Sequence, residues 1–235
     1  MPTAIRIGDY VSSPEQADLA HTGYSRLEDY ELSAFLGDWK AIHEDALLTL
    51  PDRIHPSAVI HPTANIGPDV IVGPGVRVHE FSTVRKGSVL CAGASVGFGC
   101  EVTQTFIGEG ARLGHSVGVG HSVIGTGAHL SAQVVVAAIS LLNADMRHPI
   151  TEIVLRADGD DEPYRCKAPA FGALIGDRTQ TGSTLTLGPG LAVGRDCRLS
   201  SGIHVGGRII PSSSFARQAR DLAIERRRPG GQPSR

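Results

Sequence analysis

The chain has 235 residues, a formal net charge of −2, 29 glycines, 14 prolines and only 5% aromatic residues. This length allows one well-packed domain with appendages, and the slightly acidic balance excludes a broadly basic nucleic-acid surface. So much glycine beside an ordinary hydrophobic content predicts many tight turns and argues against disorder.

The start of the chain has no basic region followed by an apolar run, so no signal peptide is expected. No apolar stretch approaches the roughly 18 residues that a membrane span needs, and no membrane contact is expected. None of the four cysteines has CxxC spacing, which favours free thiols in a reduced, cytoplasmic location. They are Cys91, Cys100, Cys166 and Cys197.

Residues 1–53 form the first expected unit, a helical segment. They contain SRLEDYELSAFLGDWKAIHEDALLTL, which predicts one or two amphipathic helices. The sequence leaves open whether this segment covers the adjoining domain or contacts a partner.

From Ile54 the chain repeats every six residues, beginning IHPSAV, IHPTAN, IGPDVI, VGPGVR. The first position is aliphatic, the second is usually glycine and the fifth is small or branched. A six-residue period fits neither an α-helix nor a lone strand. It predicts a parallel β-helix over residues 54–210, in which each hexad makes a short strand and a corner, and three hexads make a triangular coil.

Two features interrupt the repeat. VTQTF and VGHSV each lack one residue, and residues 137–172 leave the pattern altogether. An excursion that long inside a regular solenoid is usually functional or a partner contact, with a decorative β-hairpin as the alternative.

The third expected unit, residues 211–235, contains SSSFARQARDLAIERRR at 212–228. A serine N-cap, an apolar stripe and a basic last turn predict a helix there. Such a helix would cap the end of the solenoid.

The hexads resemble those of the left-handed β-helix acyltransferases, over roughly residues 54–205. IGEGARLGHSVGVGHSVIGTGAHLSA, the excursion and FGALIGDRTQTGSTLTLGPGLAVG are similar to one branch. That branch is the acetyltransferase domain of bifunctional sugar-1-phosphate nucleotidyltransferase/amino-sugar acetyltransferases. The resemblance implies a left-handed β-helix, a homotrimer, and acetyl-CoA in a groove between neighbouring prisms. Only 53 residues precede the hexads here, too few for a nucleotidyltransferase domain.

The resemblance assigns the general base to His115, in the motif LGH. Attack on a thioester needs a neutral amine, and an imidazole with a pKa of about 6.5 can accept the proton near pH 7. The tetrahedral oxyanion then needs a backbone N–H donor, and the matched position is near Ala132.

The resemblance also assigns binding residues. Arg85 matches an arginine that holds a sugar phosphate, and His129 replaces a sugar-binding asparagine. The coenzyme positions are Ser183, Ser201 and Arg217. His121 either lines the same groove or is a surface residue.

Three residues depart from the family pattern, because Thr103, Gly118 and Ala170 stand where relatives have lysine, tyrosine and lysine. All three belong to the sugar-phosphate site, so we expect an acceptor other than glucosamine-1-phosphate. The excursion could rebuild the pocket with polar residues that include Asn143 and Arg147.

The sequence therefore predicts an acyl-CoA-dependent acyltransferase that moves an acetyl or other short acyl group to an amine of a sugar, sugar phosphate or sugar-like acceptor. No metal is expected. One alternative is a non-catalytic scaffold subunit, since β-helices make rigid spacers. The other is a zinc enzyme similar to the γ-carbonic anhydrases, using histidines such as His79 and His115, although His115 and His121 lie six residues apart where that family has five.

Overall fold

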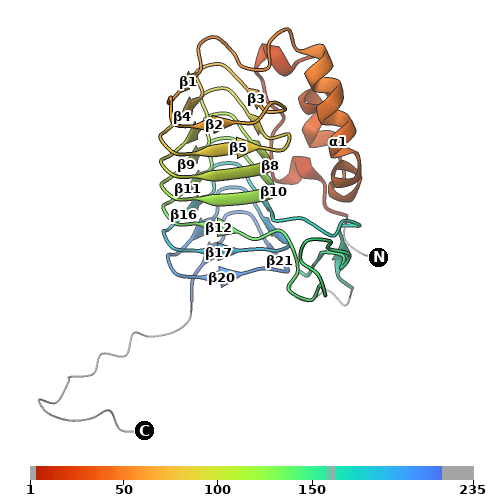
Figure 1. The fold of residues 1–235 in the computed structure, drawn as a ribbon. Coiled ribbons are helices and arrows are strands. Elements are labelled where there is room, and N and C mark those ends of the chain that lie inside the picture. Colours follow the sequence, from red (N-terminus) through yellow and green to blue (C-terminus); the bar gives the residue numbers. More distant parts are fainter. Residues whose placement is uncertain (1–3, 158, 160–161, 219–235) are drawn as a thin grey trace, which may run out of the picture.

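The computed structural model describes residues 4–157, 159 and 162–218. Its main body is a left-handed parallel β-helix with three flat faces, so the predicted fold class is confirmed (Figure 1). The solenoid extends from Ile54, which bridges to Val72, to Ala216. Residues of neighbouring coils that lie opposite one another are 18 or 17 positions apart, as the hexads predict, except across the excursion, where they are 51 positions apart.

Three faces make up the solenoid, and we call them A, B and C in chain order. Face A comprises β1 (Val59–Ile60), β4 (Arg77–Val78), β7 (Ser95–Val96), β9 (Arg112–Leu113), β11 (His129–Leu130), β16 (Gln180–Thr181), β19 (Arg198–Leu199) and β22 (Phe215–Ala216). Face B comprises β2 (Asn65–Ile66), β5 (Thr83–Arg85), the first halves of β8 (Glu101–Ile107) and β10 (Gly118–Ile124), β12 (Val135–Val136), β17 (Thr186–Leu187) and β20 (His204–Val205). Face C comprises β3 (Ile71–Val72), β6 (Val89–Leu90), the second halves of β8 and β10, β15 (Ala173–Ile175), β18 (Leu191–Val193) and β21 (Arg208–Ile210).

The two shortened hexads make β8 and β10 continuous around the corner between faces B and C. Each strand has seven residues, and it pairs with separate strands on the two faces. At the bend a single residue takes the left-handed conformation, Gln104 with φ 43° and His121 with φ 48°. The missing residue thus removes a corner turn without disturbing the register of either face.

Glycine at the second hexad position follows from how closely the coils stack. At Gly97, an added Cβ would lie 2.2 Å from the carbonyl oxygen of Gly114 in the next coil. Gly118 lies in a strand, and an added Cβ there would meet nothing within 4 Å. The repeat therefore requires glycine where backbone approaches backbone and tolerates a side chain elsewhere.

A second hydrophobic core lies outside the solenoid, between face C and residues 1–53. The strands of face C are apolar on both sides, so Val89, Phe106 and Val123 project outward and are buried there. Trp39 of α1 (Leu32–Thr49) packs into this core, and Figure 1 shows α1 along the side of the solenoid. Three short 3-10 helices precede α1, namely η1 (Ile7–Asp9), η2 (Ala17–Leu19) and η3 (Gly23–Asp29). The N-terminal segment therefore covers face C and leaves faces A and B free of it.

Buried polar groups fix the N-terminal segment to the solenoid. Gln16 accepts a hydrogen bond from the Ala92 backbone N–H at 2.6 Å, and the Asp177 carboxylate accepts one from the Ser12 hydroxyl at 2.8 Å. On α1, the His43 Nε2 lies 2.7 Å from the Asp69 carbonyl oxygen, and its Nδ1 lies 2.9 Å from the Tyr24 hydroxyl.

The predicted C-terminal helix does not begin at Ser212. Residues Phe215–Ala216 form β22, which pairs with β19 and adds one more rank to face A. The strand ladder extends past the local helix signal, because Phe215 and Ala216 continue the six-residue register. Residues 219–235, the rest of the expected helix, lie outside the described residues.

The excursion leaves the solenoid after β12 and returns at β15. It contains an antiparallel hairpin of β13 (Val154–Leu155) and β14 (Tyr164–Arg165), with Leu155 and Tyr164 buried in the second core. The four cysteines are free and buried. Among the described residues, no helix is long and apolar enough to cross a membrane.

Replacing Gly97 by alanine is expected to lower the free energy of unfolding by about 1–3 kcal/mol, because the new methyl group overlaps the backbone of the next coil. Gly118→Ala is the matched control and is expected to change it by less than about 0.5 kcal/mol. Denaturant unfolding of the two variants measures the difference. Equal effects would show that the coils separate readily at this corner.

The His43 contacts predict a pH-dependent attachment of the N-terminal segment. The Trp39 Nε1–H donates to the Tyr24 hydroxyl at 3.2 Å, so that hydroxyl donates to Nδ1 and the Nε2–H donates to Asp69, which requires a neutral ring. Burial lowers the pKa of His43 below its ordinary 6.5.

The stability contributed by neutral His43 is therefore fully present above about pH 6.5 and is lost as the pH falls through the lowered pKa. Between pH 6.5 and 5 the unfolding free energy of the wild type should fall more steeply than that of His43→Gln, by up to about 1.4 kcal/mol per pH unit. Urea titrations at several pH values test this. Parallel pH profiles would contradict it.

Candidate functional site

His115 lies at the corner between faces A and B, and its imidazole is exposed. The backbone hydrogen bonds of successive coils fix what stacks with it. The Ser116 N–H donates to the Phe98 carbonyl oxygen at 2.8 Å, and the Gln133 N–H donates to the His115 carbonyl oxygen at 2.8 Å. The His115 ring itself has no hydrogen-bond or ionic partner within the described ranges, so no polar contact with a described residue fixes its orientation.

Three further predicted residues lie in the same column of the corner. The Thr184 N–H donates to the Ala132 carbonyl oxygen, and Ser183 and Ser201 are joined by a 3.0 Å hydrogen bond. We call this set of aligned residues the His115 column. Its members, in rank order, are Glu80, Phe98, His115, Ala132, Ser183 and Ser201. After His115 the members of the column all have small side chains, so no long side chain of the column projects from this part of the corner. We call this part the lane.

A backbone donor is free beside His115. The Ala132 N–H makes no hydrogen bond to any residue that the structure describes, whereas the Gln133 N–H is occupied. Ala132 is in the next coil, directly above His115 in register. An imidazole and a free N–H one coil apart are the two groups that a tetrahedral intermediate requires.

Two other predicted residues adjoin the His115 column. His129 is exposed on face A, three residues before Ala132 and opposite Arg112 in β9. Arg217 follows β22, next to Ser200, whose N–H donates to the Ala216 carbonyl oxygen at 2.9 Å. Arg217 therefore lies one rank past Ser201, opposite Ser200 and one position before the column.

Arg85 lies on face B, away from the column, and its guanidinium forms an ion pair with Glu101 of the next coil. Both side chains are about half exposed. A phosphate at Arg85 would have to compete with this carboxylate.

His121 lies at a different corner from His115, the one between faces B and C. It is half-buried, and burial, together with the positive charge of Lys86, lowers the pKa of its imidazole. Its carbonyl oxygen accepts a 2.9 Å hydrogen bond from the Gly172 N–H, where the excursion returns. Within one chain, then, the two histidines of LGHSVGVGH are separated by the width of face B, and His121 belongs with the excursion.

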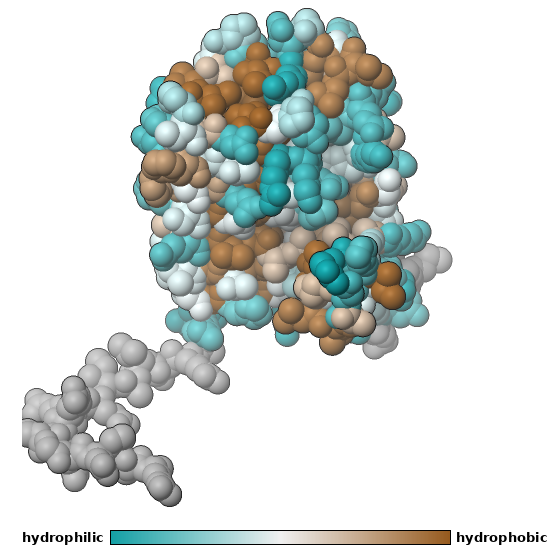
Figure 2. Space-filling view, viewed as in Figure 1, coloured by the Kyte–Doolittle hydropathy of each residue, from teal (hydrophilic) through white to brown (hydrophobic). Residues whose placement is uncertain are grey.

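Asn143 and Arg147, predicted for the acceptor site, have partners inside the excursion. The buried Asn143 accepts hydrogen bonds from the backbone N–H groups of Ile150 and Thr151, both at 2.8 Å, so it orders this loop. Arg147 is exposed and pairs with Asp145 at 3.3 Å. Figure 2 shows apolar residues gathered at the excursion. Three apolar side chains of the excursion are each more than 80% exposed, namely Leu141, Leu142 and Ile150.

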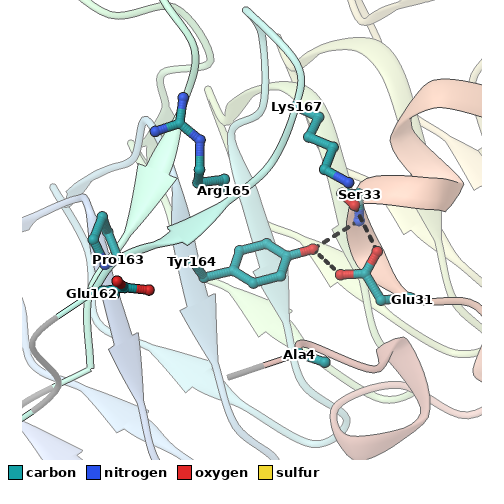
Figure 3. A pocket seen from close by; sticks show the side chains of 8 residues that line it. All are labelled: Ala4, Glu31, Ser33, Glu162, Pro163, Tyr164, Arg165 and Lys167. Carbon is teal, nitrogen blue, oxygen red and sulfur yellow. Dashed lines mark hydrogen bonds between the residues drawn. The ribbon is translucent and has the colours of Figure 1, made fainter. Parts of the chain in front are cut away.

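A pocket of about 510 Å³ is lined by residues of the hairpin and of the start of α1 (Figure 3). The Tyr164 hydroxyl donates to the Glu31 carboxylate and accepts from the Ser33 N–H at 2.8 Å. Glu31 also caps α1 by accepting from the Ala34 N–H at 3.1 Å. Burial alone would raise the pKa of Glu31, but the hydrogen bonds from Ser33, Tyr164 and Ala34 lower it overall. Burial and the Glu31 charge raise the pKa of Tyr164, so the phenol stays protonated.

The structure also bears on the zinc alternative. Among the described residues, no group of three His, Cys, Asp or Glu side chains is arranged to hold a metal ion. His79 lies two coils before Gly114, one position out of register with His115, while His121 is at another corner. Within one chain these histidines do not converge.

Two exposed arginines that were not predicted as site residues face outward near His115. Arg77 and Arg112 both occupy the sixth position of their hexads, on strands β4 and β9. The signal was present, because arginine or histidine recurs at the sixth position of hexads that end on face A, at Arg77, Arg112, His129 and Arg198. An exposed aromatic pair, Phe81 and Phe98, also lies along the same corner, with ring centroids 5.6 Å apart.

Comparison with known proteins gives one family match. The family model described as GMPPB C-terminal domain matches residues 50–148, less than half of the chain. No curated protein sequence matches the chain.

Several solved structures share the repeat architecture at low identity. A mutant form of AntD, an N-acyltransferase from Bacillus cereus, with dTDP-4-amino-4,6-dideoxyglucose and coenzyme A, is 14% identical, with a TM-score of 0.41 over 74% of this chain and 84% of that one. The Arabidopsis UDP-N-acetylglucosamine acyltransferase is 20% identical, with a TM-score of 0.34 over 70% and 67%. PerB from Caulobacter crescentus, with coenzyme A and GDP-perosamine, is 18% identical, with a TM-score of 0.30 over 75% and 59%. At these values the similarity says nothing of what this chain binds.

The Tyr164 hydroxyl links the excursion to the start of α1, and this link can be tested. Tyr164→Phe removes the acceptor of the Ser33 N–H and a donor to Glu31, and should lower the free energy of unfolding by about 1 kcal/mol. Faster hydrogen exchange at the Ser33 amide should accompany it. Tyr30→Phe is the control, since no hydrogen bond joins the Tyr30 hydroxyl to the described part of the chain. Unchanged exchange at Ser33 would contradict the proposed link.

Proposed function

We propose that this protein is an acyl-CoA-dependent acyltransferase that moves an acetyl or other short acyl group to the amine of a sugar, sugar phosphate or sugar-like acceptor. The observation that carries the proposal is the His115 column. It combines an unpartnered exposed imidazole, a free Ala132 N–H in the next coil and a lane of small side chains on one corner. The motif resemblance assigned these residues to one site, and they occupy one column.

The reaction uses His115 as the general base. The acceptor nitrogen attacks the thioester carbonyl carbon while the neutral imidazole takes a proton from the amine. The new C–N bond places negative charge on the carbonyl oxygen, which accepts a hydrogen bond from the Ala132 N–H. Collapse of this intermediate breaks the C–S bond, and the departing coenzyme A sulfur takes the proton back from His115. Protons and electrons balance without a metal.

Coenzyme A lies along the smooth part of the corner, past Ser183 and Ser201, with Arg217 near its phosphates. A guanidinium at the last rank suits that end of an extended, anionic ligand. The groove would be closed by a neighbouring prism in a cytoplasmic homotrimer, because a single corner is convex and cannot enclose a ligand.

The acceptor pocket would be formed by residues on either side of the column. His129 contributes one hydrogen bond from face A, and Arg85 a charge if it exchanges Glu101 for a phosphate. His121 and Arg147 would reach the acceptor from the excursion side, and Asn143 would act by fixing the loop. The width of face B separates the two sides in one chain, so this pocket needs the excursion of a neighbouring copy.

Thiol release from acetyl-CoA tests the proposal. The protein is mixed with amino sugars, their 1-phosphates and nucleotide-linked forms, and free coenzyme A is followed. His115→Ala should lower kcat by about 10²–10⁴-fold, whereas His204→Ala, an exposed histidine on face B, should leave it unchanged. No release with any acceptor and no melting shift with coenzyme A would instead support the scaffold alternative.

A further inference from the structure

Face A carries two arginines and a histidine in line beside His115. Arg77, Ser95, Arg112 and His129 occupy consecutive ranks of the sheet, each paired in register with the next. Neighbouring ranks are about 4.8 Å apart, so the two arginines lie roughly 10 Å apart with only a serine between them. The short side chain of Ser95 is flanked by the long side chains of Arg77 and Arg112. We call the space over Ser95, between the two arginines, the notch.

Neither arginine has an ionic or hydrogen-bonded partner in the described part of the chain. This differs from other arginines of the solenoid surface, where Arg85 pairs with Glu101 and Arg178 with Asp196. The two carboxylates at the corners that flank these four ranks, Glu80 and Glu109, contact groups other than the two arginines.

At one corner, Glu80 lies 3.8 Å from His61 and 4.0 Å from His79. At the other, Glu109 accepts hydrogen bonds from the backbone N–H groups of Glu15 and Gln16 at 2.9 and 2.7 Å. The outward side chains of these four ranks include no carboxylate.

This arrangement has a cost in the free protein. The two arginines carry like charges and repel each other across the Ser95 rank, roughly 10 Å apart. Nothing on the described part of this chain offsets that repulsion. A bound anion would, and guanidinium groups bind phosphate oxygens through paired, charge-assisted hydrogen bonds.

We propose that Arg77 and Arg112 bind a phosphate or diphosphate group over Ser95, with His129 as a neighbouring donor. That the ligand is a reactant rests on the proposed function. Arg112 and His115 share one coil three residues apart, about 10 Å along the chain, which leaves room for one sugar ring. The notch precedes His115 in rank order, whereas the small residues assigned to coenzyme A follow it. The anion therefore belongs to the acceptor, a phosphorylated or diphosphate-linked amino sugar.

Calorimetric titration with inorganic pyrophosphate at low ionic strength tests the site without acyl transfer. Arg77→Gln and Arg112→Gln should each raise the Kd about tenfold, and the double variant more. Arg178→Gln is the matched control, and its Kd should equal that of the wild type. Added salt should weaken wild-type binding more than binding to the double variant. No binding to the wild type, or the same Kd in the double variant, overturns the proposal.

Two further arms separate the sources of the phosphate. If it belongs to the acceptor, the double variant should show a raised KM for a sugar phosphate or nucleotide-linked amino sugar, with an unchanged KM for acetyl-CoA. If instead only the KM for acetyl-CoA rises, and the substitutions leave the Kd for dephospho-coenzyme A unchanged, the notch binds the coenzyme. The assignment to the acceptor is then wrong. Pyrophosphate binding that depends on Arg77 and Arg112 in a protein without thiol release would leave the anion site standing while the proposed function fails. Thiol release at the same rate in the wild type and the double variant would support the proposed function while the proposed anion site fails as an acceptor site.

Discussion

Coil-on-coil hydrogen bonding is the constraint on which the rest of the molecule depends. Paired residues on neighbouring coils are 17 or 18 positions apart, or 51 where the excursion lies between them. The corners continue the ladder, as where the Gln133 N–H donates to the His115 carbonyl oxygen. A residue is therefore placed by its rank and its column. That regularity explains the glycines at the tight corners, and it also lets four residues far apart in sequence form one line on the surface.

Burial of face C decides which surfaces remain available. The N-terminal segment lies on it through Trp39 and the outward side chains of β6, β8 and β10, and His43, Gln16 and Asp177 fix its position. Within the described part of the chain, the N-terminal segment leaves faces A and B and the corner between them uncovered. The candidate base, the free N–H of Ala132 and the unpaired arginines all lie on that remaining surface.

Much of this could be predicted from sequence, because the solenoid is repetitive and local. The six-residue pattern predicted the β-helix, which the structure confirms. The resemblance assigned His115, Ala132, Ser183 and Ser201 to one site; these residues share one column, and their roles stay a prediction. The end of the solenoid could not be read in the same way. Residues 212–216 have helix-forming features, yet pairing of Phe215 with Arg198 in the previous coil outweighs them. The state of individual charges was equally hidden, since it depends on contacts such as Arg85 with Glu101 and Tyr164 with Glu31. Those contacts join side chains whose directions the hexads do not specify.

The excursion enters and leaves the solenoid at nearly one point. The Phe171 backbone N–H donates to the Ala138 carbonyl oxygen at 2.9 Å. Val123 pairs with Leu174 in the next coil, so the ladder continues across the excursion in the same register. An insertion joined in this way leaves the register of the ladder on either side unchanged. The solenoid therefore sets where the excursion begins and ends, whereas its own residues and the N-terminal segment that it packs against set its shape.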